Sequence, residues 1–229
     1  MEYLPGGLTL DPGTDAFPLS TDSVVLKSFV RLPKNARVLD LGSGCGTIGL
    51  LLAAEDSKCH VTGIELEEKA HAAALENIRR NHLEDRLTSV CADLRNLPRD
   101  FTGQFDCCVS NPPYFSGGPA SKTHATARRE DCCSPGELFA AASTALKYGG
   151  DFFLVHRPER LAELVIRASE HQLEAKRLLL VRHRPDSAVS IIALQLRKGG
   201  KPGLRIEEGC LFDSFGNPTP YFRAVYHLD

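Results

Sequence analysis

One segment constrains the fold of this chain more than any other: a short apolar run that ends in a glycine-rich loop. Residues 36–41 (Ala-Arg-Val-Leu-Asp-Leu) predict a buried strand, and residues 47–55 predict a helix. Between them, glycine occupies every second position, at Gly42, Gly44 and Gly46. A strand, a tight glycine loop and a helix make up the first unit of a parallel α/β sheet.

The rest of the chain repeats this alternation. Further strands are expected at about 60–65, 87–91, 105–110 and 150–155, and further helices at about 67–81, 135–146 and 159–171. Two more strand-like runs, 174–183 and 188–197, flank Arg184-Pro185-Asp186-Ser187, which predicts an antiparallel hairpin. We therefore expect an α/β fold with a doubly wound, mostly parallel seven-stranded sheet and an antiparallel C-terminal hairpin.

The expected organisation has three parts. Residues 1–35 form an N-terminal segment with a helix, residues 36–197 form the α/β domain, and residues 198–229 form a tail packed on that domain. The length of 229 residues suits one such domain with a sizeable core.

The composition narrows the function classes. Lys plus Arg is 27 and Asp plus Glu is 29, so any nucleic-acid surface must be local. The chain has neither the run of roughly 18 apolar residues that a membrane span needs nor the start of a secretory signal. None of the eight cysteines forms a Cys-x-x-Cys pair, so we expect reduced thiols, no metal and a cytoplasmic protein.

The loops after three consecutive strands carry the residue types of a cofactor site. The glycine loop follows Asp40 and fails the G-x-G-x-x-G spacing of a dinucleotide site by one residue. Glu65, at the end of the second strand, is placed to accept hydrogen bonds from both hydroxyls of a ribose. After the third strand, Asp93 can receive an adenine amine and Leu94 can cover the ring. These contacts favour S-adenosylmethionine over NAD; the alternative is three unrelated strand ends with turn glycines and capping acids.

The fourth strand is followed by Asn111-Pro112-Pro113-Tyr114. Two prolines hold the backbone extended and remove two N–H donors, so the turn presents carbonyl oxygens. The side-chain oxygen of Asn111 and the carbonyl of Pro112 then offer two acceptors to one NH₂ group, and Tyr114 offers a face for a planar acceptor. Two hydrogen-bond acceptors and a stacking ring placed in this way align a weakly nucleophilic aromatic amine for attack on a sulfonium methyl group. A Pro-Pro turn that only closes a loop is the alternative.

These motifs together resemble the class I S-adenosylmethionine-dependent methyltransferases, which have a Rossmann-like fold. The Asn-Pro-Pro-Tyr run resembles the catalytic tetrapeptide of enzymes that methylate exocyclic adenine amines, or the glutamine amide of release factors. Two further stretches, 17–26 (Phe-Pro-Leu-Ser-Thr-Asp-Ser-Val-Val-Leu) and 156–161 (His-Arg-Pro-Glu-Arg-Leu), look like the bacterial tRNA(Val) adenine-N6 methyltransferase family.

The resemblance implies transfer of a methyl group from S-adenosylmethionine to the N6 amine of an adenosine beside the anticodon of a valine tRNA, leaving S-adenosylhomocysteine. It assigns catalysis to Asn111, Pro112, Pro113 and Tyr114, and it implies that the N-terminal segment closes over the methionine end of the cofactor. The expected cofactor contacts are Thr21, Asp22, Asp40, Gly42, Gly44, Gly46, Glu65, Asp93, Leu94 and Asn111. A helix N-cap is the alternative role of Ser20 or Thr21.

Two polar regions are candidates for RNA contacts. The insert 116–134 contains Lys122, Arg128 and Arg129, and the stretch from Lys176 to Arg205 holds eight basic residues and one acid. The RNA-contact candidates in this second stretch are Arg182, Arg184, Lys198 and Lys201. A surface loop and a solvated edge hairpin are the alternative interpretations.

Three other functions stay open. Release-factor glutamine methyltransferases usually carry a helical domain before the catalytic one, whereas about 35 residues precede the first strand here. A non-catalytic cofactor-binding or RNA-binding module would tolerate damage to the tetrapeptide, which is intact. Another adenine-N6 methyltransferase acting on RNA or DNA is a nearer alternative. As to assembly, we expect a monomer or a weak homodimer.

Overall fold

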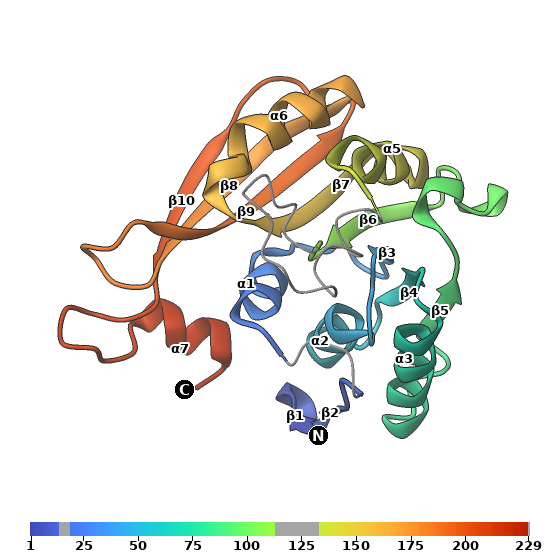
Figure 1. The fold of residues 1–229 in the computed structure, drawn as a ribbon, viewed down its shortest axis with the longest axis horizontal. Helices are drawn as coiled ribbons and strands as arrows, with labels where there is room; N and C mark the ends of the chain where they lie inside the picture. The colour runs from blue at the N-terminus through green and yellow to red at the C-terminus, as the bar shows by residue number, and fades with distance from the viewer. Residues whose placement is uncertain (14–18, 113–132, 229) are drawn as a thin grey trace, which may run out of the picture.

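A central sheet of eight strands, in the order β10-β8-β9-β7-β6-β3-β4-β5, organises the computed structural model, which describes residues 1–13, 19–112 and 133–228 (Figure 1). The strands are β3 (Arg37–Leu41), β4 (His60–Glu65), β5 (Leu87–Cys91), β6 (Phe105–Ser110), β7 (Leu146–His156), β8 (Leu173–Arg182), β9 (Val189–Lys198) and β10 (Arg205–Cys210). Strand β9 is antiparallel to both of its neighbours, and the other pairs are parallel. The mostly parallel α/β fold and the antiparallel hairpin are therefore confirmed.

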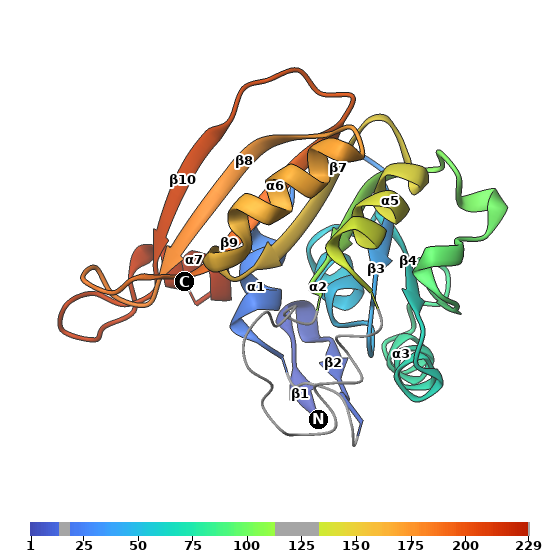
Figure 2. The ribbon, with the colours of Figure 1, turned by 45° about the horizontal axis from the view of Figure 1, so that its top comes forward.

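Helices cover both faces of the sheet (Figure 2). One face packs against α1 (Thr21–Phe29), α2 (Thr47–Glu55), α3 (Glu68–Arg80) and α7 (Pro220–Tyr226), and the other against α5 (Pro135–Ala145) and α6 (Leu161–Glu170). Strand β3 shows why both faces need cover: Val38 belongs to the first core and Leu39 to the second, since successive side chains point to opposite faces.

Short elements complete the described part of the chain. The strands β1 (Glu2–Tyr3) and β2 (Thr9–Leu10) form a separate antiparallel pair. The 3₁₀ helices are η1 (Pro5–Gly7), η2 (Leu94–Asn96), η3 (Arg99–Phe101) and η4 (Pro158–Arg160).

The central sheet has one strand more than the seven expected, and the additional strand is β10. The sequence predicts only a packed tail there, because Arg-Ile-Glu-Glu-Gly-Cys shows no apolar alternation. As an edge strand, β10 needs little burial, and it gains an ion pair between Glu207 and Arg177 of β8 at 2.8 Å. Gly209 is required, because a Cβ there would lie 2.6 Å from the ring of Tyr221 in α7.

Helix α7 joins the end of the chain to α1. The Tyr226 hydroxyl donates to Thr21 Oγ1 at 3.1 Å, and Lys27 Nζ lies 2.7 Å from His227 Nε2. Lys27 is buried, with 4% of its surface exposed, and its ammonium also pairs with Glu55 at 2.6 Å. The segment that contains the expected N-terminal cofactor contacts is thus held from the C-terminal side.

Candidate active site

The carboxyl ends of the parallel strands meet at one edge of the sheet, which we call the carboxyl edge; it is marked by Leu41, Glu65, Cys91, Ser110 and His156. Strand order reverses there, because β3 lies between β4 and β6. Such a switch point is where open α/β sheets bind ligands. At this point the buried Ser110 Oγ donates to the Leu41 carbonyl at 2.8 Å, which ties the end of β6 to the glycine loop.

The glycine loop and Glu65 form one hydrogen-bonded unit. Gly44 N donates to Glu65 Oε2 at 2.8 Å, and Glu67 N donates to Oε1 at 2.8 Å. Gly44 has φ +56, and a Cβ built on it meets nothing within 4 Å. The loop therefore presents bare backbone to open space, while the carboxylate keeps a second lone pair on each oxygen for other donors.

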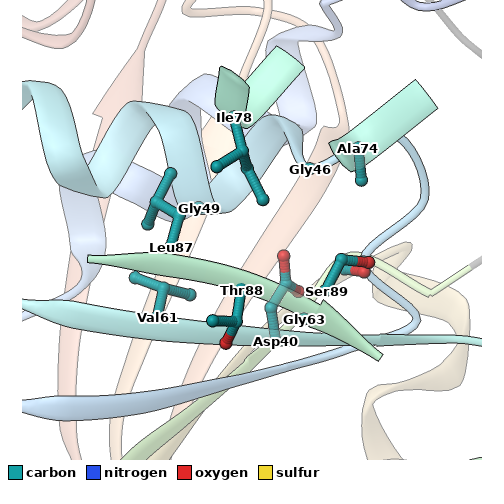
Figure 3. A pocket seen from close by; sticks show the side chains of 11 residues that line it. Asp40, Gly46, Gly49, Val61, Gly63, Ala74, Ile78, Leu87, Thr88 and Ser89 are labelled. Atoms are coloured by element: carbon teal, nitrogen blue, oxygen red, sulfur yellow. The ribbon is translucent and has the colours of Figure 1, made fainter. Parts of the chain in front are cut away.

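Asp40 lies beneath this loop rather than on its surface. It is 1% exposed, and neither carboxylate oxygen has a hydrogen-bond partner among the described residues. Burial, and then the charge of Glu65, raise the pKa of Asp40 to about 7. The cavity beside it, lined also by Ser43, Gly63 and Ser89, has a volume of about 20 Å³ (Figure 3). That is room for a single water, so the cofactor space must lie on the open side of the loop.

The third strand end is occupied by an internal ion pair. Asp93 caps η2 by accepting from Arg95 N at 2.9 Å, and its Oδ2 lies 2.6 Å from Arg95 Nη2. The Arg95 hydrogen bonds lower the pKa of Asp93, so it is ionised at neutral pH. An adenine amine would have to share this carboxylate with Arg95. Leu94 is half-buried beside it, packed against the second core.

Asn111 follows β6 directly and is oriented by α1. Its Nδ2 donates to Ser23 Oγ at 3.0 Å, and Ser23 Oγ lies 3.1 Å from Ser20 Oγ. Because the NH₂ end of the amide faces Ser23, its Oδ1 is directed elsewhere. Pro112, the next residue, is buried. Sequence reasoning missed Ser23; its signal is the spacing of one helical turn from the N-cap Ser20.

The start of α1 shows which capping alternative holds. Ser20 is the N-cap and accepts from Ser23 N at 3.2 Å, whereas Thr21 receives the Tyr226 hydroxyl. Asp22 is half-buried, and burial raises the pKa of its carboxyl against the opposing effect of Arg157. Thr21 and Asp22 directly precede Ser23, which is hydrogen-bonded to Asn111. They therefore remain proposed cofactor contacts.

His156 ends β7 beside this region. It is 1% exposed, and its Nδ1 accepts from Arg157 N at 2.8 Å. Burial lowers the pKa of His156, so the ring is neutral at pH 7. Because Nδ1 accepts this hydrogen bond, the neutral ring carries its proton on Nε2 and has no free lone pair with which to act as a base.

The expected RNA contacts separate in space. Arg182 ends β8 at the carboxyl edge, with Arg184 in the turn after it. Lys198 ends β9 at the opposite edge, where its ammonium donates to the carbonyls of Ser143 and Leu146. Lys201 follows it there. A ten-residue strand spans roughly 30 Å, so these two lysines do not share a surface with the two arginines.

Some expected site residues lie outside the described residues: Pro113, Tyr114, Lys122, Arg128 and Arg129. Within the described ranges, no group of three or more His, Cys, Asp or Glu is arranged to hold a metal ion. No helix in those ranges combines the length and the apolar character needed to cross a membrane.

The sheet order, the glycine loop and the acidic strand ends define the class of Rossmann-like methyltransferase folds, and solved structures agree. A predicted O-methyltransferase from Agrobacterium tumefaciens superimposes with a TM-score of 0.74 at 19% identity, covering 90% of this chain and 96% of that one. TYW2 of P. horikoshii, solved with MeSAdo, has a TM-score of 0.60 at 19% identity and covers 86% and 70%. Residues 18–177 match the family model of the methyltransferase small domain. The chain belongs to this family.

Curated relatives carry a more specific name. A tRNA1(Val) (adenine(37)-N6)-methyltransferase from Shewanella halifaxensis is 33% identical over 174 residues, which cover 75% of this chain and 70% of the relative. The protein of the same name from Bacteroides fragilis is 34% identical over 176 residues, covering 75% and 73%. That from Photobacterium profundum is 29% identical over 225 residues, covering 94% and 92%.

Proposed function

We propose that this protein transfers a methyl group from S-adenosylmethionine to the N6 amine of an adenosine in tRNA, next to the anticodon of a valine tRNA. The observation that carries the proposal is the position of Asn111: it directly follows β6 at the switch point, and its amide NH₂ is held by Ser23. The similarity to three relatives named for that reaction supports the choice of substrate.

The residues at the carboxyl edge fit the methyl donor. The bare backbone at Gly42 and Gly44 leaves a cradle that a Cβ would fill. Glu65 would hold the ribose hydroxyls, and Asp93 with Leu94 would receive the adenine. Thr21 and Asp22, at the start of α1, would face the methionine end, with Asp40 supporting the loop from below. When bound, S-adenosylmethionine supplies an electrophilic methyl group on a sulfonium centre.

The acceptor side would work by alignment. The Oδ1 of Asn111 and the carbonyl of Pro112 would each accept a hydrogen bond from one N–H of the exocyclic amine, which holds the nitrogen and its lone pair in line. Such positioning can supply a large part of a rate enhancement. A general base is not needed before transfer, because the methylated nitrogen is cationic and loses its proton readily. The neutral, buried His156 is consistent with that sequence.

The target base would have to leave the stack of the anticodon loop. Turning it out costs a few kcal/mol, which stacking on Tyr114 would offset by roughly 1–3 kcal/mol. We therefore expect Tyr114→Ala to lose most activity on tRNA and Tyr114→Phe to keep most of it. Equal losses in the two variants would assign the role to the hydroxyl instead of the ring.

The direct experiment uses methyl-labelled S-adenosylmethionine with unmodified bulk tRNA or with release factor. We expect label in tRNA, recovered as N6-methyladenosine after digestion to nucleosides. Label in release factor alone would identify a glutamine methyltransferase, and label in neither would remove the proposal.

A further inference from the structure

One loop at the carboxyl edge presents an aromatic ring to solvent on a fixed backbone. Phe215 lies at the tip of the loop 213–217 and is 90% exposed. Asp213 Oδ1 accepts from Phe215 N at 2.8 Å and from Asn217 N at 2.9 Å, while its Oδ2 accepts from Asn217 Nδ2 at 3.1 Å. A backbone bond from Gly216 N to the Asp213 carbonyl, at 3.1 Å, closes the turn. A ring on such a loop can stack on a partner with little loss of backbone entropy.

This loop is joined to the basic turn between β8 and β9. Leu211 N donates to the Arg182 carbonyl and Phe212 N to the His183 carbonyl, both at 3.0 Å. The rings of His183 and Phe212 lie 5.0 Å apart. A Cβ on Gly216 would lie 3.8 Å from Arg184 Nη2, so the guanidinium reaches the tip beside Phe215. The loop and the turn, residues 182–187 and 211–217, form one surface, which we call the tip surface.

The chemistry of the tip surface favours RNA over protein. The turn that adjoins the loop of its exposed ring carries Arg182, His183 and Arg184, with Asp186 as the acid of the same turn. Of the two other acids nearby, Asp213 uses its carboxylate within the loop, and Glu208 of β10 lines the same cavity as Arg182. One ring among charges offers far less contiguous apolar area than a stable protein interface buries. An aromatic face beside guanidinium groups is instead the pattern that holds unpaired nucleotides.

The position of the tip surface fits a substrate already engaged at Asn111. Strands β8 and β10 end at the same edge as β6, and three strand spacings of roughly 4.8 Å separate β6 from β8. The register also places Arg182 four residues, roughly 13 Å, beyond the β8 residue that is level with Ser110, so the turn lies on the order of 20 Å from Asn111. An RNA loop with one base turned into the site spans that distance with neighbouring nucleotides.

We propose that the tip surface is a second contact for the RNA substrate: Phe215 stacks on an unpaired base outside the active site, and Arg182 and Arg184 bind flanking phosphates. This inference rests on the proposed function, because it takes its RNA from that reaction. It adds a binding element that acts on substrate affinity and leaves the chemical step alone.

The test measures binding of fluorescently labelled, unmodified tRNA by anisotropy at several salt concentrations. Phe215→Ala should bind about tenfold more weakly with an unchanged salt slope, and Phe215→Trp should restore affinity. Arg184→Ala should also weaken binding, but it should reduce the slope of log K against log salt by about one. The controls are Tyr148→Ala, an 81% exposed ring near the opposite edge, and Lys34→Ala, an exposed charge before β3.

In steady-state assays, Phe215→Ala should raise KM for tRNA with turnover at saturation unchanged. The inference is overturned if Phe215→Ala binds tRNA as the wild type and Tyr148→Ala do. It is also overturned if sedimentation shows that the substitution abolishes self-association while RNA affinity stays constant, since the ring would then be a protein contact. Failure of the proposed function is a different result: the wild-type protein would not methylate tRNA at all.

Discussion

The amide of Asn111 donates from Nδ2 to Ser23 Oγ across 88 residues of sequence, at 3.0 Å. This bond decides which end of the amide faces the substrate, because an amide has one acceptor end and one donor end. With its NH₂ group used by Ser23, Asn111 presents an oxygen to an incoming amine. Helix α1, whose first residues are proposed cofactor contacts, thus also orients the proposed acceptor side.

Removing the hydrogen bond that orients Asn111 should slow methyl transfer without weakening the binding of the cofactor. Ser23→Ala leaves the amide free to rotate, so we expect turnover to fall by about tenfold, with S-adenosylmethionine affinity and KM for tRNA nearly unchanged. Ser28→Ala is the matched control, since that hydroxyl bonds to the Val25 carbonyl within the same helix. Equal losses in both variants would mean that α1 was merely destabilised.

Asn111 itself should affect turnover more than cofactor binding. Asn111→Ala removes an acceptor that matters when the amine is aligned, so we expect a loss of on the order of a hundredfold in kcat. Calorimetric titration with S-adenosylmethionine should show nearly wild-type affinity. If affinity and rate fell together, Asn111 would be a structural residue of the cofactor side.

Glu65 should show the opposite behaviour. Glu65→Ala removes the carboxylate that receives Gly44 N and, in our proposal, the ribose hydroxyls, so cofactor binding should weaken by roughly 1–3 kcal/mol. Calorimetry on the folded variant measures this directly. Glu67→Ala, with an exposed side chain beside it, should bind normally, and a Glu65→Ala protein with unchanged affinity would remove Glu65 from the site.

Asp40 predicts a pH dependence of stability. Its pKa is raised from 3.8 to about 7 in the folded protein, so the native state holds this proton where the unfolded state has lost it. Stability from this group is therefore present below about pH 4 and is lost as pH rises to about 7. Asp40→Asn should remove that loss and stabilise the cofactor-free protein at pH 8 by roughly 2–4 kcal/mol.

Denaturant unfolding of both proteins at pH 5 and pH 8 checks this. The advantage of Asp40→Asn should grow between the two values. A constant difference would show that the Asp40 carboxyl is ionised throughout, with a compensating partner.

Much of the fold could be predicted because most of its central strands are short apolar runs that alternate with helical segments. The segments 47–55, 60–65, 87–91 and 105–110 coincide with α2, β4, β5 and β6. Strand β10 could not be found this way, because an edge strand buries little and its pairing depends on Arg177, some thirty positions earlier. Similarly, β7 begins at Leu146 rather than near 150, because it runs through the glycine pair 149–150.

The candidate site, like the fold, could be predicted from the sequence only in part. Glycine spacing and strand ends located Glu65, Asp93 and Asn111, because parallel strands bring such positions to one edge. Charge density, by contrast, could not separate Arg182 from Lys198. The two lie sixteen positions apart, and β9 carries the chain between them from the carboxyl edge to the opposite edge. Nor could charge density show that the Lys198 ammonium donates to the carbonyls of Ser143 in α5 and Leu146 at the start of β7. Contacts made across such distances, including that of Ser23, require the fold itself.

The contact between Lys27 and His227 has a consequence for synthesis on the ribosome. The two residues are 200 positions apart, so α1 must wait for its partner while those 200 residues are made. At about 5–20 residues per second, that delay is on the order of 10–40 s. During it, a lysine destined for burial lacks its histidine, and helix α1, which carries Ser23, is only partly supported. A nascent chain is therefore expected to gain its activity only after His227 has been made, and not as each strand of the sheet emerges.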